Sequence, residues 1–564
     1  MTGASRPALI EKLLEPAAYP HPVGPIKLIE THISWVFLTG PFAYKVKKPC
    51  KLEFLDFSTL DRRCQFCAEE IRLNRRFAPG LYLAAVPITG CPQAPHVDGL
   101  GEPIEWAVKL VQFDEADRLD ARFEAGKIDA AACRELGVAI AAVQASQAVA
   151  APASGHGSPD RLRAVFRMNL DEIRRHRPDA AARADTIERW LEARLARDHA
   201  QFEARVGSGR IRECHGDLHL ANLVLLDGRP VAFDSIEFNP DLRWIDVASD
   251  IAFLTMDLES RGRPDLAAQV TSAWMEAAND HSAAAVLPVH RVARAVVRAA
   301  VAAIRSAQGD CPPEAAAAAR RESDRYLDLA ERLAAPAPPL LLVTTGVSGA
   351  GKSTLAAECV GAFGAVRLRS DVERKRLFAL AATDRRGDAL TTVDLYGEET
   401  TRQVYQRLSG LAHELLKAGA SVVVDATCQA RFQRDLLAAV ARDSGARLVW
   451  LDLDLPADLL CARVAARAKL GRDPSDATPE TVLAQLASRE PIGADELVAA
   501  PGGVAPLHVR VGVDELAAPA RFLGDLARRL PCDLPGSPCP PALDPTGSHS
   551  ALNVSPEARV TRPK

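Results

Sequence analysis

The feature that most constrains the fold of this chain is a glycine-rich segment in its second half, Gly346-Val347-Ser348-Gly349-Ala350-Gly351-Lys352-Ser353. The segment fits the P-loop pattern in full, with an apolar strand pattern before it and a helical pattern after it. Backbone amides of such a loop converge on phosphate oxygens. The predicted nucleotide-binding residues are therefore Gly346, Ser348, Gly349, Ala350, Gly351, Lys352, Ser353 and Thr354, with Ser353 also a ligand of Mg²⁺.

Strand and helix patterns alternate around this loop. The predicted strands cover residues 340–345, 366–369, 421–425, 447–453 and 507–511, and helical patterns lie between them. Such an alternation predicts an α/β fold with a doubly wound parallel sheet.

The chain of 564 residues is too long for one ordinary core. A proline-rich stretch at 334–339 has the composition of a stiff linker. We therefore expect a first domain at 1–333 and a P-loop domain at 340–530. The tail at 531–564 is rich in Pro, Ser and Gly and is predicted to be disordered.

The first domain is predicted to be an α+β, two-lobed, protein-kinase-like unit. Strand patterns at 28–38 and 42–47 flank the turn dipeptide Gly40-Pro41 and predict a hairpin. A helical stretch at 59–77 and strand patterns at 81–88 and 104–113 follow. Long Ala-, Arg- and Leu-rich helical patterns then dominate, which gives a sheet-rich lobe followed by a helical lobe.

The segment Cys214-His215-Gly216-Asp217-Leu218-His219-Leu220-Ala221-Asn222 carries the chemistry of this first domain. Its Asp-to-Asn spacing of five matches a kinase catalytic loop, and Asp234 ends the next apolar run. Asp217 is the predicted catalytic base, with Asn222 and Asp234 as Mg²⁺ ligands. The alternative, a metal site built on His215 and His219, is disfavoured because Gly216 indicates a loop.

A kinase-like small lobe also needs a lysine and a glutamate that hold the nucleotide phosphates. Phe42-Ala43-Tyr44-Lys45 resembles the corresponding strand motif, so Lys45 is the first candidate. Lys47 lies on the same strand face and stays open as the alternative. Glu69 or Glu70 is the expected partner. The turn at 31–34 has no glycine, which makes the nucleotide clamp unusual.

In the P-loop domain, Asp371 follows the second predicted strand and is placed to accept a proton from a substrate hydroxyl. Arg374, one helical turn later, is expected to hold an anionic substrate group. Asp425 ends the third strand and is expected to support Mg²⁺. Lid arginines for the transferring phosphate are predicted at Arg463, Arg467 and Arg472. A capping aspartate and solvated arginines remain the alternative for these positions.

On these motifs the first domain resembles the aminoglycoside phosphotransferase and choline kinase group. The second resembles P-loop kinases of the polynucleotide kinase, zeta-toxin and gluconate kinase group, and the whole order resembles bacterial bifunctional aminoglycoside phosphotransferase/ATP-binding proteins. The resemblance implies ATP and Mg²⁺ as cofactors and the base roles given above to Asp217 and Asp371. It also implies that Asp246 and Asp250 brace the catalytic loop.

The net charge and the composition of the chain limit the classes of partner that it is expected to bind. A net charge of -4 argues against a bulk nucleic-acid binder, and no apolar stretch of membrane-spanning length lacks charges. Twelve scattered cysteines and the absence of a signal-peptide pattern predict a cytoplasmic protein. A helical pattern at 289–307 aligns four arginines, for which a solvated basic stripe is the favoured interpretation and a site for an acidic or phosphorylated substrate the alternative. These arginines are Arg291, Arg294, Arg298 and Arg305.

The leading hypothesis is a bifunctional ATP-dependent phosphotransferase, each domain acting on a hydroxyl of a small substrate. Two alternatives stay open. The first domain is a nucleotide-sensing pseudokinase that regulates the second, or the second is a polynucleotide-end kinase.

Overall fold

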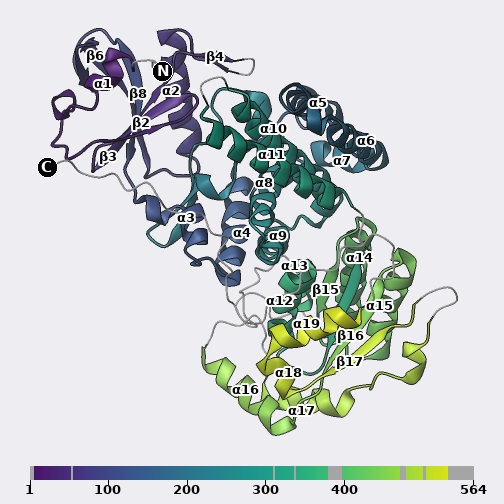
Figure 1. Cartoon of the computed structure of the whole chain (residues 1–564). Coiled ribbons are helices and arrows are strands. Elements are labelled where there is room, and N and C mark those ends of the chain that lie inside the picture. Colours follow the sequence, from purple (N-terminus) through teal and green to yellow (C-terminus); the bar gives the residue numbers. More distant parts are fainter. Residues whose placement is uncertain are drawn as a thin grey trace.

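The computed structural model describes residues 6–52, 55–308, 311–335, 338–378, 397–470, 478–499 and 504–530, with only the backbone described at 467–470. Figure 1 shows three successive bodies: a sheet-rich lobe at the N-terminal end, a helical lobe, and a parallel-sheet unit. The first two form the kinase-like domain expected from the sequence, and the third is the P-loop unit.

The small lobe is a six-stranded antiparallel sheet of order β1-β2-β3-β8-β6-β7, covered by α2 (Leu60–Asn74). The predicted hairpin about Gly40-Pro41 is confirmed, but the turn at 31–33 divides its first strand in two. The strands are β1 (Lys27–Glu30), β2 (Ser34–Leu38), β3 (Phe42–Lys47), β6 (Tyr82–Cys91), β7 (Ala94–Val97) and β8 (Glu105–Val111).

The alternation of side chains along β3 explains why Lys45 and Lys47 lie on the same face of the sheet. Tyr44 and Val46 enter one apolar cluster of the small lobe, whereas Ala43 enters the cluster on the other face, beneath α2. Because side chains alternate along a strand, Lys45 and Lys47 share the face of Ala43. The sheet therefore directs both lysines toward α2.

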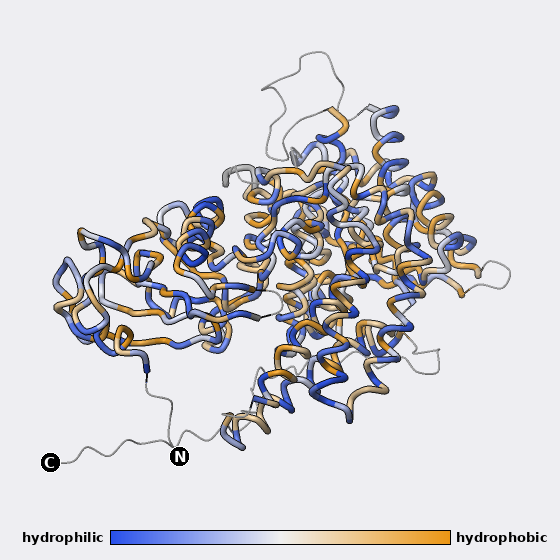
Figure 2. The backbone as a smooth tube through the Cα atoms, turned by 90° about the horizontal axis from the view of Figure 1, so that it is seen from above, coloured by the Kyte–Doolittle hydropathy of each residue, from blue (hydrophilic) through white to orange (hydrophobic). Residues whose placement is uncertain are grey.

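The helical lobe is built around α8 (Val247–Ser260), whose residues from Val247 to Leu258 are all buried. Two short strand pairs, β9 (Ile211–Glu213) with β12 (Trp244–Asp246) and β10 (Leu223–Leu226) with β11 (Arg229–Ala232), frame the catalytic segment. The surrounding helices are α3 (Leu119–Glu124), α4 (Ala130–Ala145), α5 (Pro159–His176), α6 (Ala181–Arg197), α7 (His199–Gly207), α9 (Pro264–Ala278), α10 (Leu287–Ser306) and α11 (Pro313–Ala334). Along these helices hydrophobic and hydrophilic residues alternate, which Figure 2 shows as orange and blue bands.

The P-loop unit is a five-stranded parallel sheet of order β14-β15-β13-β16-β17. Its strands are β13 (Leu340–Thr345), β14 (Val366–Arg369), β15 (Val422–Asp425), β16 (Arg447–Leu453) and β17 (Leu507–Val511). Its helices are α12 (Lys352–Phe363), α13 (Ser370–Leu377), α14 (Glu398–Lys417), α15 (Arg431–Ser444), α16 (Ala457–Leu470), α17 (Pro479–Ser488), α18 (Val513–Ala517) and α19 (Pro519–Arg529). The P-loop lies at the carboxyl end of the central strand β13, where ligands bind in open parallel sheets.

The two units dock through α9. This helix packs on α4 and α8 within the helical lobe and on α12 and β14 of the P-loop unit. Gln269 donates from Nε2 to the carbonyl of Ala357 on α12 (2.8 Å), and Ser272 Oγ accepts from the amide of Arg367 on β14 (3.0 Å). One cluster of buried apolar side chains runs through both units.

The domain boundary at 334–339 stays a prediction, and residues 336–337 lie outside the described part of the chain. The predicted disordered tail at 531–564 also lies outside it. Among the described helices, none is long and apolar enough to cross a membrane.

Candidate active sites

Lys45 contacts two other residues of the predicted kinase-like site. Its Nζ lies 2.9 Å from Glu70 Oε1 and forms an ion pair with Asp234, which follows β11. Asp234 holds the left-handed backbone conformation with φ +64°, which is uncommon outside glycine and clusters at functional sites. Three predicted site residues from three segments, Lys45, Glu70 and Asp234, thus come together.

Lys47 lies deeper. Its side chain is 0% exposed, its Nζ lies 2.6 Å from Glu70 Oε2, and it also pairs with Glu237. Burial raises the pKa of Glu70, but the charges of Lys45 and Lys47 outweigh it and lower that pKa to about 2. Because Lys45 alone of the two pairs with Asp234, it is better placed for a nucleotide, and Lys47 neutralises buried carboxylates.

Of the two glutamates considered from the sequence, Glu70 faces the lysines. Glu69 points elsewhere and accepts hydrogen bonds from Arg72 (2.7 Å) and Arg243 (2.8 Å). Successive residues of a helix point about 100° apart, so only one of the pair can reach the sheet. The expectation for Glu69 is corrected accordingly.

Asp217 stands at the centre of the catalytic loop with its side chain 37% exposed. Asn222 Nδ2 donates to Asp217 Oδ2 at 2.9 Å, and His219 Nε2 lies 3.4 Å from the same oxygen. Burial raises the pKa of Asp217, yet the neighbouring His219 more than compensates, so the pKa is lowered and the carboxylate form is favoured. Asp217 and Asn222, which the sequence assigned to one site, therefore lie in hydrogen-bond contact.

Carboxylate side chains of α8 accept hydrogen bonds from the backbone of this loop. The amides of His215 and Gly216 donate to Asp250 at 2.8 and 2.9 Å, and the amide of Leu220 donates to Asp257 at 3.1 Å. Asp250 thus braces the loop as expected, and Asp257 is a second brace that sequence reasoning missed.

Asp246 does not touch the loop. It caps α8 by accepting from the Ala248 amide and pairs with Arg205 at 2.8 Å. His215 is engaged with the carbonyl of Phe233 through Nε2 (2.9 Å), whereas His219 faces Asp217. The Nδ1 atom of His215 also accepts from the amide of Asp217 at 3.3 Å, so both histidines contact Asp217. Among the described residues no group of three or more His, Cys, Asp or Glu could hold a metal ion, so the metal site considered for these histidines is not supported.

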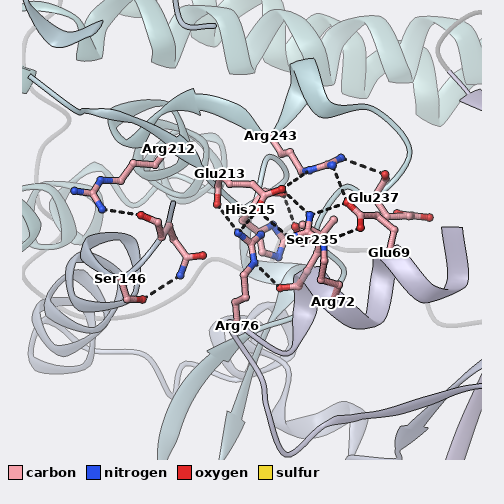
Figure 3. A network of polar contacts seen from close by, with 12 residues as sticks. Glu69, Arg72, Arg76, Ser146, Arg212, Glu213, His215, Ser235, Glu237 and Arg243 are labelled. Carbon is pink, nitrogen blue, oxygen red and sulfur yellow. Dashed lines mark hydrogen bonds and ion pairs between the residues drawn. The ribbon is translucent and has the colours of Figure 1, made fainter. Parts of the chain in front are cut away.

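Figure 3 shows a network that ties α2 to the catalytic segment. Glu213, which immediately precedes that segment, accepts from Arg72 (2.7 Å), Arg76 (2.8 Å) and Arg243 (3.2 Å). Because α2 also carries Glu70, the network fixes the lysine-binding helix relative to Asp217. Sequence reasoning did not find it, since arginines and glutamates are frequent throughout this chain.

The turn between β1 and β2 is closed without glycine. Thr31 Oγ1 accepts from the amide of Ser34 at 2.9 Å. Ser34 Oγ is buried and has no hydrogen-bond partner among the described residues. The turn is therefore short and polar, as its sequence predicted.

In the P-loop, Gly346, Gly349 and Gly351 have φ values of +134°, +83° and +95°, which side-chain-bearing residues rarely adopt. Lys352 Nζ donates to the carbonyl of Val347 at 2.8 Å and so closes over its own loop. The amide of Ser348 donates to Gln485 of α17 at 2.8 Å. Gln485 is a contact that the sequence did not reveal.

Ser353 and Asp425 meet beside this loop, with Ser353 Oγ donating to Asp425 Oδ1 at 3.2 Å. Arg367, another residue missed from the sequence, donates from Nε to Asp425 Oδ2 at 3.1 Å. A hydroxyl and a carboxylate are oxygen ligands of the kind that Mg²⁺ prefers. The part of the chain that the structure describes has no group of three or more His, Cys, Asp or Glu that could hold a metal unaided. The donor set therefore fits Mg²⁺ shared with phosphate oxygens and water.

Asp371 lies in the first turn of α13, directly after β14. Burial raises its pKa, as does the charge of Asp425, while Arg374 and Lys352 oppose the rise. Four charged side chains from the P-loop, β15 and α13 therefore share one site. Arg374 is buried and donates to Thr401 of α14 at 3.4 Å.

The lid prediction is supported at one position. Arg463 Nη1 lies 3.9 Å from the point that a Cβ on Gly351 would occupy, so this arginine stands over the P-loop. The side chain of Arg467 and the whole of Arg472 lie outside the described residues, and both remain predictions.

Comparison with known proteins finds a separate family match in each of the two units. Residues 65–287 match the family model described as "Phosphotransferase enzyme family", and residues 341–492 match the one described as "AAA domain". The chain is 31% identical over 476 residues to the uncharacterized protein Rv2004c of Mycobacterium tuberculosis, an alignment that covers 83% of this chain and 92% of that protein. A protein of Mycobacterium bovis matches equally.

Solved structures match each half at low identity. A choline/ethanolamine kinase family protein from Mesorhizobium loti is 12% identical, covering 54% of this chain and 92% of its own, with a TM-score of 0.33. A gluconokinase from Sinorhizobium meliloti is 21% identical, covering 35% of this chain and 97% of its own, with a TM-score of 0.23. TM-scores of this size do not support a family assignment. The family of this chain is therefore assigned from the family models and the mycobacterial relatives. The chain therefore belongs to the same family as these mycobacterial proteins, and in this chain a domain of the phosphotransferase enzyme family is followed by an AAA domain of the P-loop kinase type.

Proposed function

We propose that the chain is a bifunctional ATP-dependent phosphotransferase, in which each domain transfers the γ-phosphoryl group of ATP to a hydroxyl of a small substrate. The observation that supports the proposal is that each unit has a lysine predicted to bind phosphate and a carboxylate predicted to accept the proton of the substrate. In the first unit these are Lys45 and Asp217, and in the second Lys352 and Asp371.

In the kinase-like site, Lys45 would bind nucleotide phosphate while Glu70 keeps its amine oriented. Asp217 would accept the proton of the acceptor hydroxyl, and its lowered pKa keeps it ionised for that step. Asn222 and Asp234 would hold Mg²⁺, which supplies neutralising charge on the phosphate oxygens when bound. The buried Lys47 and Glu237 would keep the floor of the site rigid.

In the P-loop site, the loop amides and Lys352 would hold the β- and γ-phosphates. Ser353 and Asp425 would hold Mg²⁺, and Arg367 fixes the carboxylate of Asp425. Asp371, whose raised pKa suits a base, would accept the proton of the acceptor hydroxyl. Arg374 and Arg463 would stabilise charge on the acceptor and on the transferring group.

The test is acceptor-resolved transfer from radiolabelled ATP to a metabolite panel by wild type, Asp217→Asn and Lys352→Ala. We expect each variant to lose a different set of products. If Asp217→Asn loses no product while Lys352→Ala loses all of them, the first domain is a regulatory nucleotide sensor and the bifunctional proposal is wrong. An oligonucleotide with a free 5′-hydroxyl belongs in the panel, because its labelling would identify the second domain as an end kinase.

A further inference from the structure

Four arginines lie along α10, which packs against α8 and α11. Three of them lie within ion-pair distance of a glutamate. Arg291 pairs with Glu259, Arg305 donates to Glu322 at 2.8 Å, and Arg298 lies 3.6 Å from Glu322. The expectation of a simple solvated stripe does not describe Arg294, which has no such pair among the described residues, or Arg298, which shares its glutamate with Arg305.

Arg294 is half-buried against α8. Its guanidinium carbon lies 4.8 Å from the centroid of the Phe253 ring, and its Nε donates to the carbonyl of Ser249 at 3.3 Å. Within the described residues, no carboxylate lies at ion-pair distance from Arg294. A partly desolvated cation without a carboxylate at ion-pair distance is costly, and an anion bound from outside the chain would lower this cost.

The same phenylalanine connects Arg294 to the catalytic centre. The Phe253 ring lies 5.4 Å from the ring of His219, and His219 Nε2 lies 3.4 Å from Asp217 Oδ2. Burial lowers the pKa of Arg294, and the charges of Asp250 and Asp217 oppose that fall. Phe253 and His219 therefore form a chain of contacts that links Arg294 to Asp217.

Arg298 lies one helical turn further along the same face. Its Nη2 is 3.6 Å from Glu322 Oε1, its guanidinium carbon is 5.7 Å from the Tyr326 ring centroid, and its side chain is 30% exposed. Glu322 is shared with Arg305, so it only partly neutralises Arg298. Because residues four apart share one face of a helix, Arg298 and Arg294 can contact the same bound group.

We propose that Arg294 and Arg298 bind an anionic group, a carboxylate or a phosphate, on the acceptor that is phosphorylated at Asp217. The inference rests on the proposed function of this site and narrows its substrate class. A guanidinium presents several donors in one plane and suits both kinds of anion. A cationic acceptor would meet like charge at this position and be disfavoured.

The substrate class is tested with acceptors of matched skeleton and different charge. We would use glycerol, glycerate, glycerol 3-phosphate and 3-aminopropane-1,2-diol, with erythritol and erythronate as a second pair, and measure transfer by wild type and Asp217→Asn. We expect wild type to transfer phosphate to the anionic acceptors and Asp217→Asn to lose this transfer. Comparing glycerate with glycerol 3-phosphate then shows whether the site prefers a carboxylate or a phosphate. Preference for neutral or cationic members would overturn the inference and leave the proposed function standing. Absence of any Asp217-dependent transfer would overturn both.

The arginines are tested one at a time on the best acceptor. Arg294→Met and Arg298→Met are expected to raise the KM for the acceptor about 100-fold while the KM for ATP stays unchanged. Arg294→Lys keeps the charge and should lose less than Arg294→Met, a rescue that a purely packing role would not give. Arg332→Met, at an exposed position of the neighbouring helix α11, is the control and should leave the acceptor KM unchanged.

The opposite pattern would overturn the proposal. If Arg294→Met and Arg298→Met raise the KM for ATP and leave the acceptor KM unchanged, the arginines hold nucleotide phosphate instead. Thermal melting shows whether each variant folds. If Arg294→Met does not fold, the acceptor KM values of Arg298→Met and Arg294→Lys test the proposal in its place.

Discussion

Arg369 donates from Nε to Glu276 Oε2 at 2.7 Å, and this ion pair joins the two domains beside a candidate catalytic helix. Arg369 is the residue before α13, which carries Asp371 and Arg374. Glu276 lies on α9 of the first domain, and its carbonyl also accepts from Arg376 of α13. The helix that presents the proposed base is thus anchored to the other domain.

We therefore expect Glu276→Gln to slow transfer at the P-loop site by about tenfold, because small displacements of a catalytic group are costly. Transfer at the kinase-like site should be unaffected. The measurement is the kcat of each site with its own acceptor. Glu314→Gln, an exposed position on α11, is the control, and an unchanged P-loop rate in Glu276→Gln would show that the anchor has no catalytic consequence.

The two lysines of β3 should differ in what their loss affects. Lys47→Met leaves Glu70 and Glu237 buried with less neutralisation, and breaking a buried pair costs about 3–5 kcal/mol. Lys45→Met keeps the Lys47–Glu70 pair, so it should mainly raise the KM for ATP. Urea denaturation and ATP titration of both variants check this, and a larger stability loss in Lys45→Met would contradict it.

Asp371 should make stability depend on pH. Its pKa is raised in the folded protein by burial and by Asp425, so the folded state holds the proton more tightly than the unfolded chain. Its contribution to stability therefore becomes less favourable as the pH rises through the folded-state pKa. Asp371→Asn should melt at a higher temperature than wild type at neutral pH, without nucleotide or Mg²⁺, and lose this advantage in acid. A lower melting temperature at neutral pH would be inconsistent with the assigned shift.

Gly216 should tolerate no side chain. It has φ +87°, and a Cβ there would lie 2.7 Å from the carbonyl of Leu242. Gly216→Ala should displace the loop that carries Asp217 and cost about 1–3 kcal/mol in backbone strain alone. Gly228→Ala is a matched control, because Gly228 has φ +76° with open space around it. Comparable transfer at the kinase-like site in both variants would show that the close contact is unimportant.

The sequence predicted the P-loop sheet almost to the residue because its three inner strands are largely apolar runs and its two edge strands, β14 and β17, alternate apolar and polar residues. Only the third strand differs, starting at Val422 where 421 was expected. The catalytic loop was equally accessible, since the spacing of Asp217, Asn222 and Asp234 is set by chemistry close to the reacting atoms.

The choice between Glu69 and Glu70 could not be made from the sequence, because it depends on how α2 is rotated against the sheet. The second brace, Asp257, is visible only once α8 is placed under the loop. The docking residues of α9 were also hidden, because Gln269, Ser272 and Glu276 have the composition of an ordinary solvated helix face. Contacts between distant segments leave no local pattern.

The most direct test of the central claim, two separate nucleotide sites, is the binding stoichiometry of a non-hydrolysable ATP analogue with Mg²⁺, measured by isothermal titration calorimetry. We predict two sites per chain in wild type. In Lys45→Met and Lys352→Ala, one of the two should be weakened by about tenfold or more, since each loses a charge-assisted contact to phosphate. One site in wild type, or the loss of both sites through either substitution, would contradict the account.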